Sequence, residues 1–380
     1  MRIILATESI RHPLTGVGRY TQELARQLAA LPQITSLRFL HGARLCERLP
    51  DPVAAPAVVP WLRDRLSRVH AAADAYRHLH NLARARALRG EGAALLHGCN
   101  YYLPAFDGPS VATFHDISIY RWAECHRADR VRYMRKELAL SLRRARLILT
   151  VSEFSRREIA DRFDWPLARI RAVPLAASAA FRPHAAAELA APLHALGLHH
   201  DGYGLFLGTI EPRKNLETLL RAYAELPMAL RARWPLAVAG HPGWHSAGLH
   251  ARMRRAEQAG WLRYLGYVEE ARLPALVAGA RLFAFPSLYE GFGLPVLEAM
   301  ASGTPVLCSD AAALPEVAGA AAALFAPRDV DALAALLARG LEDAPWRAAL
   351  AAAGRRRAAQ FGWRRCAELT ADAYRDAWSA

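Results

Sequence analysis

Residues 287–305 read SLYEGFGLPVLEAMASGTP, and this stretch decides the fold because three kinds of element meet in it. An apolar run, residues 281–286 (RLFAFP), ends just before it and predicts a buried strand. A glycine-rich loop follows over residues 290–293. A short helix is expected from Leu294, where the next residue is a proline that suits the first turn, and Gly303 is placed to end that helix. The stretch therefore predicts a strand–loop–helix unit of an α/β protein.

This loop and helix suit a phosphate, because a helix N-terminus presents free N–H groups and the positive end of the helix dipole. Two carboxylates, Glu290 and Glu298, lie eight residues apart, which is about 12 Å along one helix axis. We expect Glu290 in the loop, facing the group beyond the phosphate, and Glu298 on the helix, accepting hydrogen bonds from hydroxyls on the other side. This layout suits a sugar–phosphate–ribose ligand; the alternative is an ordinary α/β loop with two surface glutamates. The amides expected to hold the phosphate are those of Gly291, Phe292, Gly293 and Leu294.

Length and composition fit a globular protein of two domains. The chain has 380 residues, of which 53% are hydrophobic and 22% charged. We expect no signal peptide, because the apolar run at the N-terminus is short, and no stretch of about 20 apolar residues predicts a membrane span. The five cysteines are scattered and odd in number, so we expect reduced thiols with neither a disulfide framework nor a zinc site.

The net charge of +14 favours anionic partners: nucleic acid, phosphorylated substrates or an acidic membrane. Only two of the 49 basic residues are lysines, Lys136 and Lys214, and this composition bias weakens the meaning of any single arginine. The strongly basic segment Trp61–Arg89 has a helical pattern with apolar partners. It predicts either an interfacial helix on an anionic membrane or a solvated, arginine-rich helix.

The first half of the chain opens with an expected buried strand, Arg2–Thr7, and a loop, Arg11–Tyr20, that leads into an amphipathic helix. Gly16 and Gly18 would let the backbone approach a ligand closely, although a plain turn is an equal alternative. A dinucleotide fingerprint needs a third glycine, and Thr21 stands in its place, so the sequence argues against NAD.

A His-Asp pair, His115 and Asp116, follows the expected strand 111–114. Open α/β sheets bind ligands at the carboxyl ends of their strands. His115 is therefore a candidate for orienting a sugar hydroxyl or transferring a proton, and Asp116 is expected to position the loop. A purely structural histidine is the alternative.

The second half opens with an expected strand at 203–209, followed by Glu211-Pro-Arg-Lys-Asn215 and a helix. Arg213 offers a planar fork for phosphate oxygens and Lys214 a compact charge. Both would offset the charge that grows on a departing nucleoside diphosphate. The alternative is a solvated basic turn.

Residues 290–298, EGFGLPVLE, resemble the E-x7-E signature of retaining, GT-B fold glycosyltransferases of family GT4, and the resemblance covers nearly the whole chain. It implies that Arg213 and Lys214 contact the donor pyrophosphate and that His115 lies against the transferred sugar. It implies further that Glu298 holds the ribose hydroxyls and Glu290 the sugar hydroxyls. The loop with Gly16 and Gly18 would lie over the donor phosphates or the acceptor, and the nucleobase would meet the backbone near Tyr267 and Val268.

The similarity points to bacterial mannosyltransferases that extend O-antigen polysaccharide. It implies a GDP-linked mannose or D-rhamnose donor, a lipid-linked glycan acceptor, and a place on the inner face of the cytoplasmic membrane without a membrane span. We interpret the sequence as lacking a metal-binding Asp-x-Asp motif, and so predict transfer without a metal or other cofactor. No carboxylate is evidently placed for a covalent double displacement.

Three alternatives remain at this stage. The donor could be a UDP-sugar. The chain could be a GT-B epimerase acting on UDP-N-acetylglucosamine, although the E-x7-E spacing argues against it. It could also be a non-catalytic binder of an anionic ligand such as nucleic acid, although the arginines are spread along the chain and no nucleic-acid motif occurs.

Strands alternate with helices in both halves, which predicts two Rossmann-like, doubly wound parallel-sheet domains facing a cleft. The first, on the acceptor side, is expected over residues 1–178, with the C-terminal helix 363–380 packing back on it. A linker is expected over 179–202. The second domain, expected over 203–362, would bind the nucleotide sugar.

Overall fold

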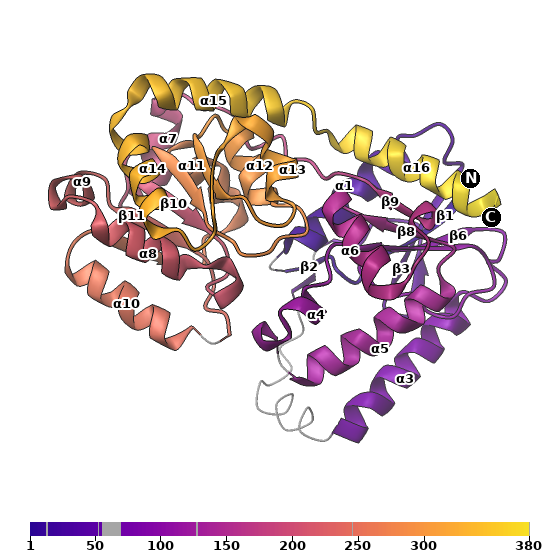
Figure 1. Ribbon diagram of the computed structural model, residues 1–380. Helices are drawn as coiled ribbons and strands as arrows, with labels where there is room; N and C mark the ends of the chain where they lie inside the picture. The colour runs from indigo at the N-terminus through magenta and orange to yellow at the C-terminus, as the bar shows by residue number, and fades with distance from the viewer. Residues whose placement is uncertain (13, 52, 55–69, 127, 245, 380) are drawn as a thin grey trace. The chain divides into compact units, whose positions relative to one another are not determined.

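The chain folds into two compact units, each built on a mainly parallel sheet with helices around it (Figure 1). Unit 1 comprises Met1–Leu175 and Trp363–Ala380, and unit 2 comprises Ala176–Gly362. The predicted fold class, two Rossmann-like parallel-sheet domains, is confirmed. The computed structural model describes residues 1–12, 14–51, 53–54, 70–126, 128–244 and 246–379.

The sheet of unit 1 has seven strands in the order β4-β3-β1-β6-β7-β8-β9, all parallel except the β3–β4 pair at one edge. Its central strands consist almost wholly of buried residues, as expected of a parallel sheet covered on both faces. The strands are β1 (Arg2–Ala6), β3 (Ser36–His41), β4 (Arg44–Cys46), β6 (Leu95–Gly98), β7 (Ser110–Phe114), β8 (Leu147–Thr150) and β9 (Ile170–Ala172), with a separate pair β2 (Arg11–His12) and β5 (Val53–Ala54).

Helices of unit 1 follow its strands. Helix α6 begins with a serine cap, since the Ser152 side chain accepts a hydrogen bond of 3.1 Å from the Ser155 amide. Of the basic segment predicted as one helix, residues 70–87 form α3, and residues 61–69 lie outside the described residues. In the described part of the chain, no helix is both long and apolar enough to cross a bilayer. The helices are α1 (Gly16–Ala29), α3 (His70–Ala87), α4 (Ser118–Arg121), α5 (Ala128–Arg144), α6 (Glu153–Phe163) and α16 (Trp363–Ser379).

The expected loop Arg11–Tyr20 ends earlier than predicted, because helix α1 begins at Gly16. Thr15 caps the helix by accepting a hydrogen bond of 3.3 Å from the Gly18 amide. Gly18 lies in the first turn, where a Cβ atom would come within 2.6 Å of the Ser9 carbonyl oxygen. The packing of α1 against the loop after β1 therefore accounts for this glycine without a ligand.

The sheet of unit 2 has six parallel strands in the order β12-β11-β10-β13-β14-β15. They are β10 (Gly204–Leu207), β11 (Leu236–Ala239), β12 (Leu262–Gly266), β13 (Leu282–Phe285), β14 (Val306–Ser309) and β15 (Ala323–Phe325). Its helices are α7 (Ala186–His194), α8 (Leu216–Glu225), α9 (Met228–Arg233), α10 (Ala247–Gln258), α11 (Leu273–Ala278), α12 (Leu294–Ala301), α13 (Leu314–Ala318), α14 (Val330–Glu342) and α15 (Ala344–Ala358).

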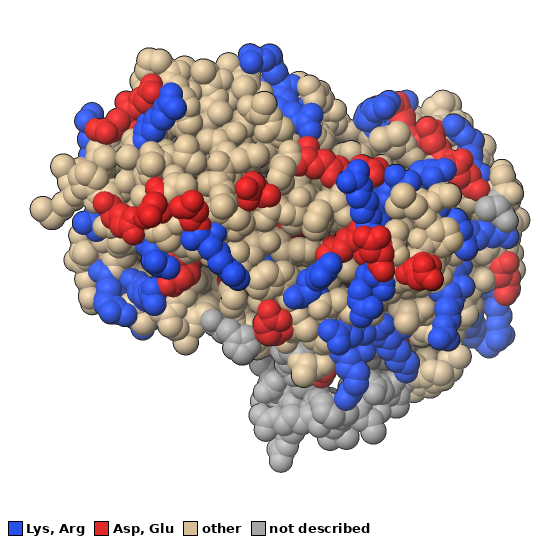
Figure 2. Space-filling model, in the orientation of Figure 1, with Lys and Arg blue, Asp and Glu red and all other residues tan. Residues whose placement is uncertain are grey.

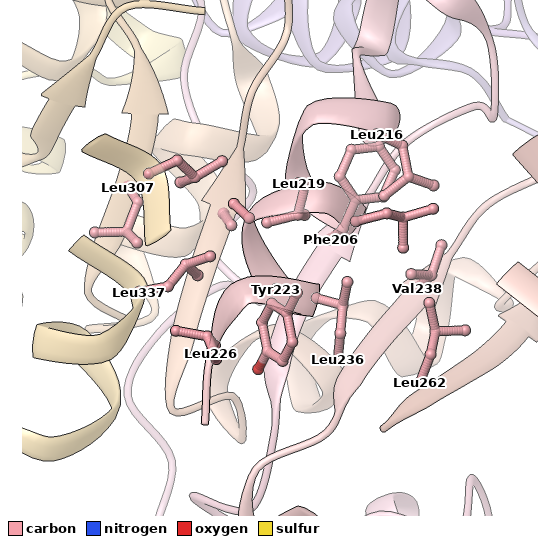
Figure 3. Close-up of a cluster of buried hydrophobic side chains, with 14 of the residues drawn as sticks. Phe206, Leu216, Leu219, Tyr223, Leu226, Leu236, Val238, Leu262, Leu307 and Leu337 are labelled. Carbon is pink, nitrogen blue, oxygen red and sulfur yellow. The ribbon is translucent and has the colours of Figure 1, made fainter. Parts of the chain in front are cut away.

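The core of unit 2 lies between its sheet and helices α8 and α14. Figure 3 shows the strand residues Phe206, Leu236 and Val238 beside Leu219 and Tyr223 of α8, and all five are fully buried. The hydroxyl of Tyr223 donates a hydrogen bond of 2.8 Å to the Trp234 carbonyl oxygen. This core fixes the position of α8 against the sheet of unit 2.

The domain boundaries differ from those predicted. Unit 2 begins at Ala176, and the segment 179–202, expected to be a linker, carries helix α7. This helix packs against α11 and buries Leu189 and Leu193, so the apolar spacing within an alanine-rich stretch marks part of unit 2. Helix α16 belongs to unit 1, where it packs against α1.

In each sheet, the chain first adds strands on one side of the first strand and then adds the later strands on its other side. In unit 1 the chain runs outward from β1 through β3, then returns to the other side of β1 with β6. In unit 2 it runs from β10 through β11 and β12, then returns beside β10 with β13. Ligands of open α/β sheets bind outside the carboxyl ends of the strands at such switch points. We therefore expect ligands to bind at the loops after β1 and β6 in unit 1, and at those after β10 and β13 in unit 2.

The predicted end of α12 is confirmed. Gly303 has φ +77°, its amide donates a hydrogen bond of 3.0 Å to Met300, and the Thr304 amide donates one of 3.0 Å to Ala299. These two bonds form a Schellman motif, which satisfies carbonyl groups of the last turn.

We predict opposite stability effects for two glycine-to-alanine changes in unit 2. Gly303→Ala should lower the free energy of unfolding by about 1–2 kcal/mol, because an L-residue is strained at this φ. Gly248→Ala, on exposed helix α10 with no atom near the new Cβ, should raise it by roughly 0.4–1 kcal/mol. Urea unfolding measures both, and shifts in the same direction would contradict the prediction.

Candidate functional site

An ion cluster joins the loops after β10 and β13, at the switch point of unit 2. The Glu290 carboxylate accepts a hydrogen bond of 2.5 Å from Lys214 Nζ and lies 3.3 Å from Arg213 Nη1. Glu290 is 9% exposed, so this pairing takes place largely away from water. The structure thus brings together three of the residues that the sequence predicted, since Glu290 lies more than 70 positions after Arg213 and Lys214 in the chain.

Arg213 is held on three sides. Its guanidinium donates to the Glu211 carboxylate at 3.0 Å from Nε and to the Tyr289 carbonyl oxygen at 2.7 Å, in addition to its contact with Glu290. The cluster of Glu211, Arg213, Lys214 and Glu290 contains two cations and two carboxylates, so its formal charge is zero. A diphosphate that bound here would compete with Glu290 for both cations.

Two residues that sequence reasoning did not single out hold this cluster in place. Asn215, in the left-handed region with φ +54°, donates from its amide to the Pro286 carbonyl oxygen at 2.9 Å, and so ties the β10 loop to the end of β13. Ser287 donates a hydrogen bond of 2.6 Å to Glu290. Both side chains lie within quoted motifs, but only the fold shows that they bridge two loops.

The pKa of the Glu290 carboxyl lies below its usual value. Burial acts to raise this pKa, but the neighbouring charges of Lys214 and Arg213 act in the opposite direction and prevail. Glu290 is therefore ionised at neutral pH and can act as an acceptor of hydrogen bonds, but not as a proton donor.

Helix α12 starts beside this cluster. Gly293 precedes its first residue with φ +105°, and a Cβ at this position would lie 2.5 Å from the side chain of Leu314. Only glycine suits both the backbone and the packing here. The first turn contains Leu294, and its N-terminus follows directly on the loop that carries Glu290, Gly291 and Phe292. The structure thus has a helix N-terminus at the predicted position, and the binding of a phosphate there stays a prediction.

Glu298 lies in the middle of α12 and is 3% exposed. A carboxylate is rarely buried to this degree without a role in binding or structure. The structure places it on a rigid helix and Glu290 on a loop, which is the division that the sequence predicted.

Tyr267 and Val268 follow β12, two strands away from β10. Tyr267 is 44% exposed, and its ring stacks on His241 with the ring centroids 4.3 Å apart and the planes 15° from parallel. Neighbouring strands lie about 4.8 Å apart, so this aromatic pair lies about 10 Å along the sheet edge from the β10 loop. That spacing suits a nucleoside whose diphosphate reaches Arg213 and Lys214. Sequence reasoning missed His241, because nothing in its local pattern marks a stacking partner.

Unit 1 holds a cavity of about 550 Å³ at its own switch point. Its lining comes mainly from the loops after β1, β6 and β7, with further residues from helices α1 and α5, and includes two carboxylates, two arginines and the predicted His115. Among the lining residues are Glu8, Arg11, Asn100, Tyr102, Asp116 and Arg130. A cavity of this size, with mixed polar and aromatic walls, suits a small polar ligand such as a sugar.

His115 is oriented by a backbone group. Its Nε2 lies 3.0 Å from the Cys99 carbonyl oxygen, which can only accept, so Nε2 carries the proton and Nδ1 is the free acceptor of the neutral ring. Burial lowers the pKa of His115 and outweighs the opposite effects of the Cys99 carbonyl and Asp116. The neutral imidazole can therefore accept a hydrogen bond from a ligand hydroxyl through Nδ1.

Asp116 serves the loop, as predicted. Its Oδ1 accepts hydrogen bonds of 2.8 Å from the Ser118 amide and 3.1 Å from the Tyr101 hydroxyl. Tyr101 has φ +57°, which is uncommon for an aromatic residue and is held in place by these contacts. Gly16, at the start of α1, lies between Thr15 and Val17, which both line the cavity of unit 1. A Cβ on Gly16 would meet no atom within 4 Å.

The interpretation that the sequence lacks an Asp-x-Asp motif was wrong in the literal sense, because Asp329-Val330-Asp331 is one. Asp329 caps helix α14, and its Oδ1 accepts a hydrogen bond of 2.9 Å from the Ala332 amide. This triplet is therefore explained as a helix N-terminus.

Comparisons with known proteins agree with this architecture. The family described as "Glycosyltransferase Family 4" matches residues 14–179, and "Glycosyl transferases group 1" matches residues 199–357. The chain is 45% identical to O-antigen chain mannosyltransferase B from Escherichia coli, over 99% of this chain and 100% of that protein. It is 34% identical to the serotype-specific mannosyltransferase WbdA of Escherichia coli, over 73% of this chain and 35% of that protein.

Solved structures show the same fold at low sequence identity. Sucrose-phosphate synthase from Thermosynechococcus elongatus superimposes with a TM-score of 0.70 at 20% identity, and each chain is covered in full. Anabaena HepE in complex with UDP-glucose also gives a TM-score of 0.70, at 18% identity over 99% of this chain and 100% of that one. The two parallel-sheet units thus have the GT-B fold, and the family matches and the full-length relative identify the chain as a glycosyltransferase. The chain belongs to glycosyltransferase family 4, as the sequence resemblance indicated.

We predict that Glu290→Gln lowers the free energy of unfolding at pH 7 by about 3–5 kcal/mol, because it removes the buried counter-charge of Lys214 and leaves Arg213 with Glu211 as its remaining carboxylate partner. The folded-state pKa of Glu290 is lowered, so its stabilising effect is complete above the usual glutamate pKa of 4.5 and is lost as the pH falls through the folded value. The difference between wild type and variant should therefore shrink below about pH 4.5.

A matched control is Glu217→Gln, which removes an exposed partner of Arg252 in the same unit. It should change stability by no more than about 1 kcal/mol. Urea unfolding at several pH values measures both variants, and equal losses would contradict a special role for the buried cluster.

Proposed function

We propose that this enzyme transfers mannose or D-rhamnose from a GDP-sugar to a lipid-linked glycan, with retention of anomeric configuration, in the synthesis of O-antigen polysaccharide. The observation that carries this proposal is the full-length 45% identity to O-antigen chain mannosyltransferase B, combined with an ion cluster suited to a diphosphate at the unit 2 switch point. WbdA, which the chain also matches, is a mannosyltransferase too.

Unit 2 supplies the donor chemistry in this proposal. Arg213 and Lys214 neutralise the charge that grows on the leaving diphosphate, and the N-terminus of α12 adds its dipole. Glu290, ionised and fixed by Ser287, accepts hydrogen bonds from sugar hydroxyls, and Glu298 accepts them from the ribose. The base lies against the aromatic pair of Tyr267 and His241, beside Val268.

Unit 1 supplies the acceptor side. The cavity at its switch point holds the end of the acceptor glycan, and His115 accepts a hydrogen bond from a hydroxyl of the transferred sugar. In the transfer step the bond between the sugar carbon C1 and the donor phosphate oxygen breaks, and a bond from C1 to the acceptor oxygen forms on the same face. The leaving phosphate oxygen takes the acceptor proton, so neither a carboxylate nucleophile nor a metal ion is needed.

The identity of the donor nucleotide can be tested by thermal unfolding. A nucleotide at 100 times its Kd adds about 2.7 kcal/mol to the free energy of unfolding. At one common concentration of GDP, UDP or ADP, the nucleotide that binds most tightly therefore gives the largest rise in unfolding temperature. We expect a GDP-selective shift that persists with a chelator and disappears in Arg213→Ala and Glu298→Ala. Arg252→Ala, which removes an exposed arginine of unit 2, is the control that should retain it.

The outcomes separate the alternatives. A UDP-selective shift would keep the fold and transfer chemistry but overturn the GDP-sugar donor. Loss of activity in the chelator would overturn metal-independent transfer. Turnover of a UDP-sugar without an acceptor would favour the epimerase, and salt-sensitive DNA binding without any nucleotide effect would favour a non-catalytic binder. With GDP-mannose and a lipid-linked mannose acceptor, NMR of the product gives its anomeric configuration.

We also propose peripheral binding to the inner face of the cytoplasmic membrane, where a lipid-linked acceptor would lie. Helix α3 exposes Leu79 (65%) and Leu82 (53%) one turn apart. A cavity of about 360 Å³ between α3 and α5 is lined by Arg132, Lys136 and Arg144, among others. Figure 2 shows basic side chains gathered over this part of unit 1. Apolar side chains beside cations are the pattern of an interfacial helix on an anionic surface.

We predict that the protein sediments with vesicles containing anionic lipid and that binding weakens as the salt concentration rises. Replacing Leu79 and Leu82 together by serine should reduce this binding at least severalfold, because both side chains lose their apolar contact with the bilayer. Leu167→Ser removes a similarly exposed leucine elsewhere on unit 1 and should leave binding unchanged. Equal binding of all three proteins would overturn the assignment of α3 to the membrane.

A further inference from the structure

Four buried polar side chains connect helix α16 to the core of unit 1, and the proposed reaction does not use them. Tyr374 of α16 lies 2.7 Å from Nδ1 of His97, whose Nε2 lies 2.7 Å from the Thr113 hydroxyl. The Thr113 hydroxyl lies 2.9 Å from that of Tyr20 on α1. Each of the four residues is at most 2% exposed. They form one continuous chain from the C-terminal helix to α1.

Each of these four side chains has a hydrogen-bond partner within the network. Burial lowers the pKa of His97 to about 3, so its ring is neutral, with one nitrogen donating and the other accepting. The hydroxyl groups of Tyr374, Thr113 and Tyr20 can each donate and accept, so a consistent direction of donation runs through all four side chains. A buried polar network in which every member has a partner fixes the relative positions of its elements.

Two contacts lead from this network to His115. The ring of Tyr20 meets the His115 ring edge to face, with centroids 4.9 Å apart and planes at 84°. Cys99, two residues after His97 at the end of β6, provides the carbonyl that accepts the His115 Nε2 proton. The orientation of His115 therefore depends on Tyr20 and on the end of β6, and the network holds both.

We propose that Tyr374, His97, Thr113 and Tyr20 are positioning residues for His115, so that the imidazole is correctly oriented only when helix α16 is docked on unit 1. The proposal rests on the role of His115 in the proposed transfer. Helix α16 begins at Trp363, directly after the last residue of unit 2, and its buried face includes Cys366, Ala367 and Thr370. The end of the chain thus has a part in the site and does more than cover the sheet.

The test uses variants that remove one hydroxyl and keep the ring. Tyr374→Phe and Tyr20→Phe break the network at its two ends. Tyr223→Phe removes an equally buried tyrosine hydroxyl from the core of unit 2 and is the control for a general loss of stability. All three are measured in the full-length protein for thermal unfolding, GDP-induced stabilisation, and kcat and KM.

We expect both network variants to fold and to bind GDP as wild type does, with the donor KM changed less than about twofold. Their kcat should fall about tenfold or more, because a small misplacement of a group in the site has effects of this order. Tyr223→Phe should leave kcat unchanged. A fall in kcat that is the same in all three variants, or a change confined to KM, would overturn the proposal.

A second readout does not depend on activity. The Cε1–H signal of His115 in NMR spectra can be identified by its loss in His115→Gln. In the wild type it is expected to be shifted by the ring of Tyr20 and to titrate below pH 6.5, because burial lowers the pKa of His115 despite Asp116. The other titratable groups around this ring are Cys99, Tyr20 and His97.

In Tyr374→Phe and Tyr20→Phe this signal should move and should titrate at higher pH, since a ring that is less well held is better hydrated. An unchanged signal in both variants would overturn the positioning role even if the enzyme showed no transfer. Conversely, if the wild type transfers no sugar while both variants show the NMR change, the proposed function is overturned and the network keeps its role in orienting His115.

Discussion

The contact between Glu290 and the pair Lys214 and Arg213 is the interaction on which the switch-point site of unit 2 depends. It joins the loop after β10 to the loop after β13, which are adjacent in the sheet but far apart in the chain. Breaking a buried pair by removing one partner is costly, because the remaining charge stays desolvated. The two loops are thus held in register by the same charges that the proposed diphosphate would contact.

Parallel-sheet topology explains why this cluster lies where it does. A strand that returns beside the first strand of its unit leaves two neighbouring loops that diverge at the carboxyl edge. Unit 2 fills that space with Glu290 and its cations, whereas unit 1 leaves a cavity lined by Glu8, Asn100 and His115. The same topology therefore gives a charged, tightly bonded site in one unit and a roomier polar one in the other, as a phosphate-bearing donor and a neutral glycan would require.

Much of this could be predicted from the sequence. The strand, loop and helix around Glu290, the cap at Ser152 and the end of α12 at Gly303 follow from local rules of helix termini and buried strands. Local rules do not show pairing across the fold. Asn215 and His241 gain their roles only when β10 meets β13 and β11 meets β12, and His97 gains its role when α16 returns to unit 1. The close approach of Gly18 to the Ser9 carbonyl depends on the fold in the same way, while the predicted closeness of Gly18 to a ligand stays a prediction.

The net charge of +14 belongs to the whole chain and differs from the charge of the ion cluster in unit 2. At first sight it suggests a strongly basic donor pocket, yet the cluster at the β10–β13 switch point contains equal numbers of cations and carboxylates. By contrast, the cavity between α3 and α5 has Arg132, Lys136 and Arg144 against Glu137. Long-range attraction of anions follows unbalanced surface charge, whereas selectivity for a diphosphate follows paired, oriented charge. In the proposed function, the unbalanced cations beside α3 and α5 would therefore attract the protein to an anionic surface, whereas Lys214, one of two lysines in the chain, would act through the balanced ion cluster.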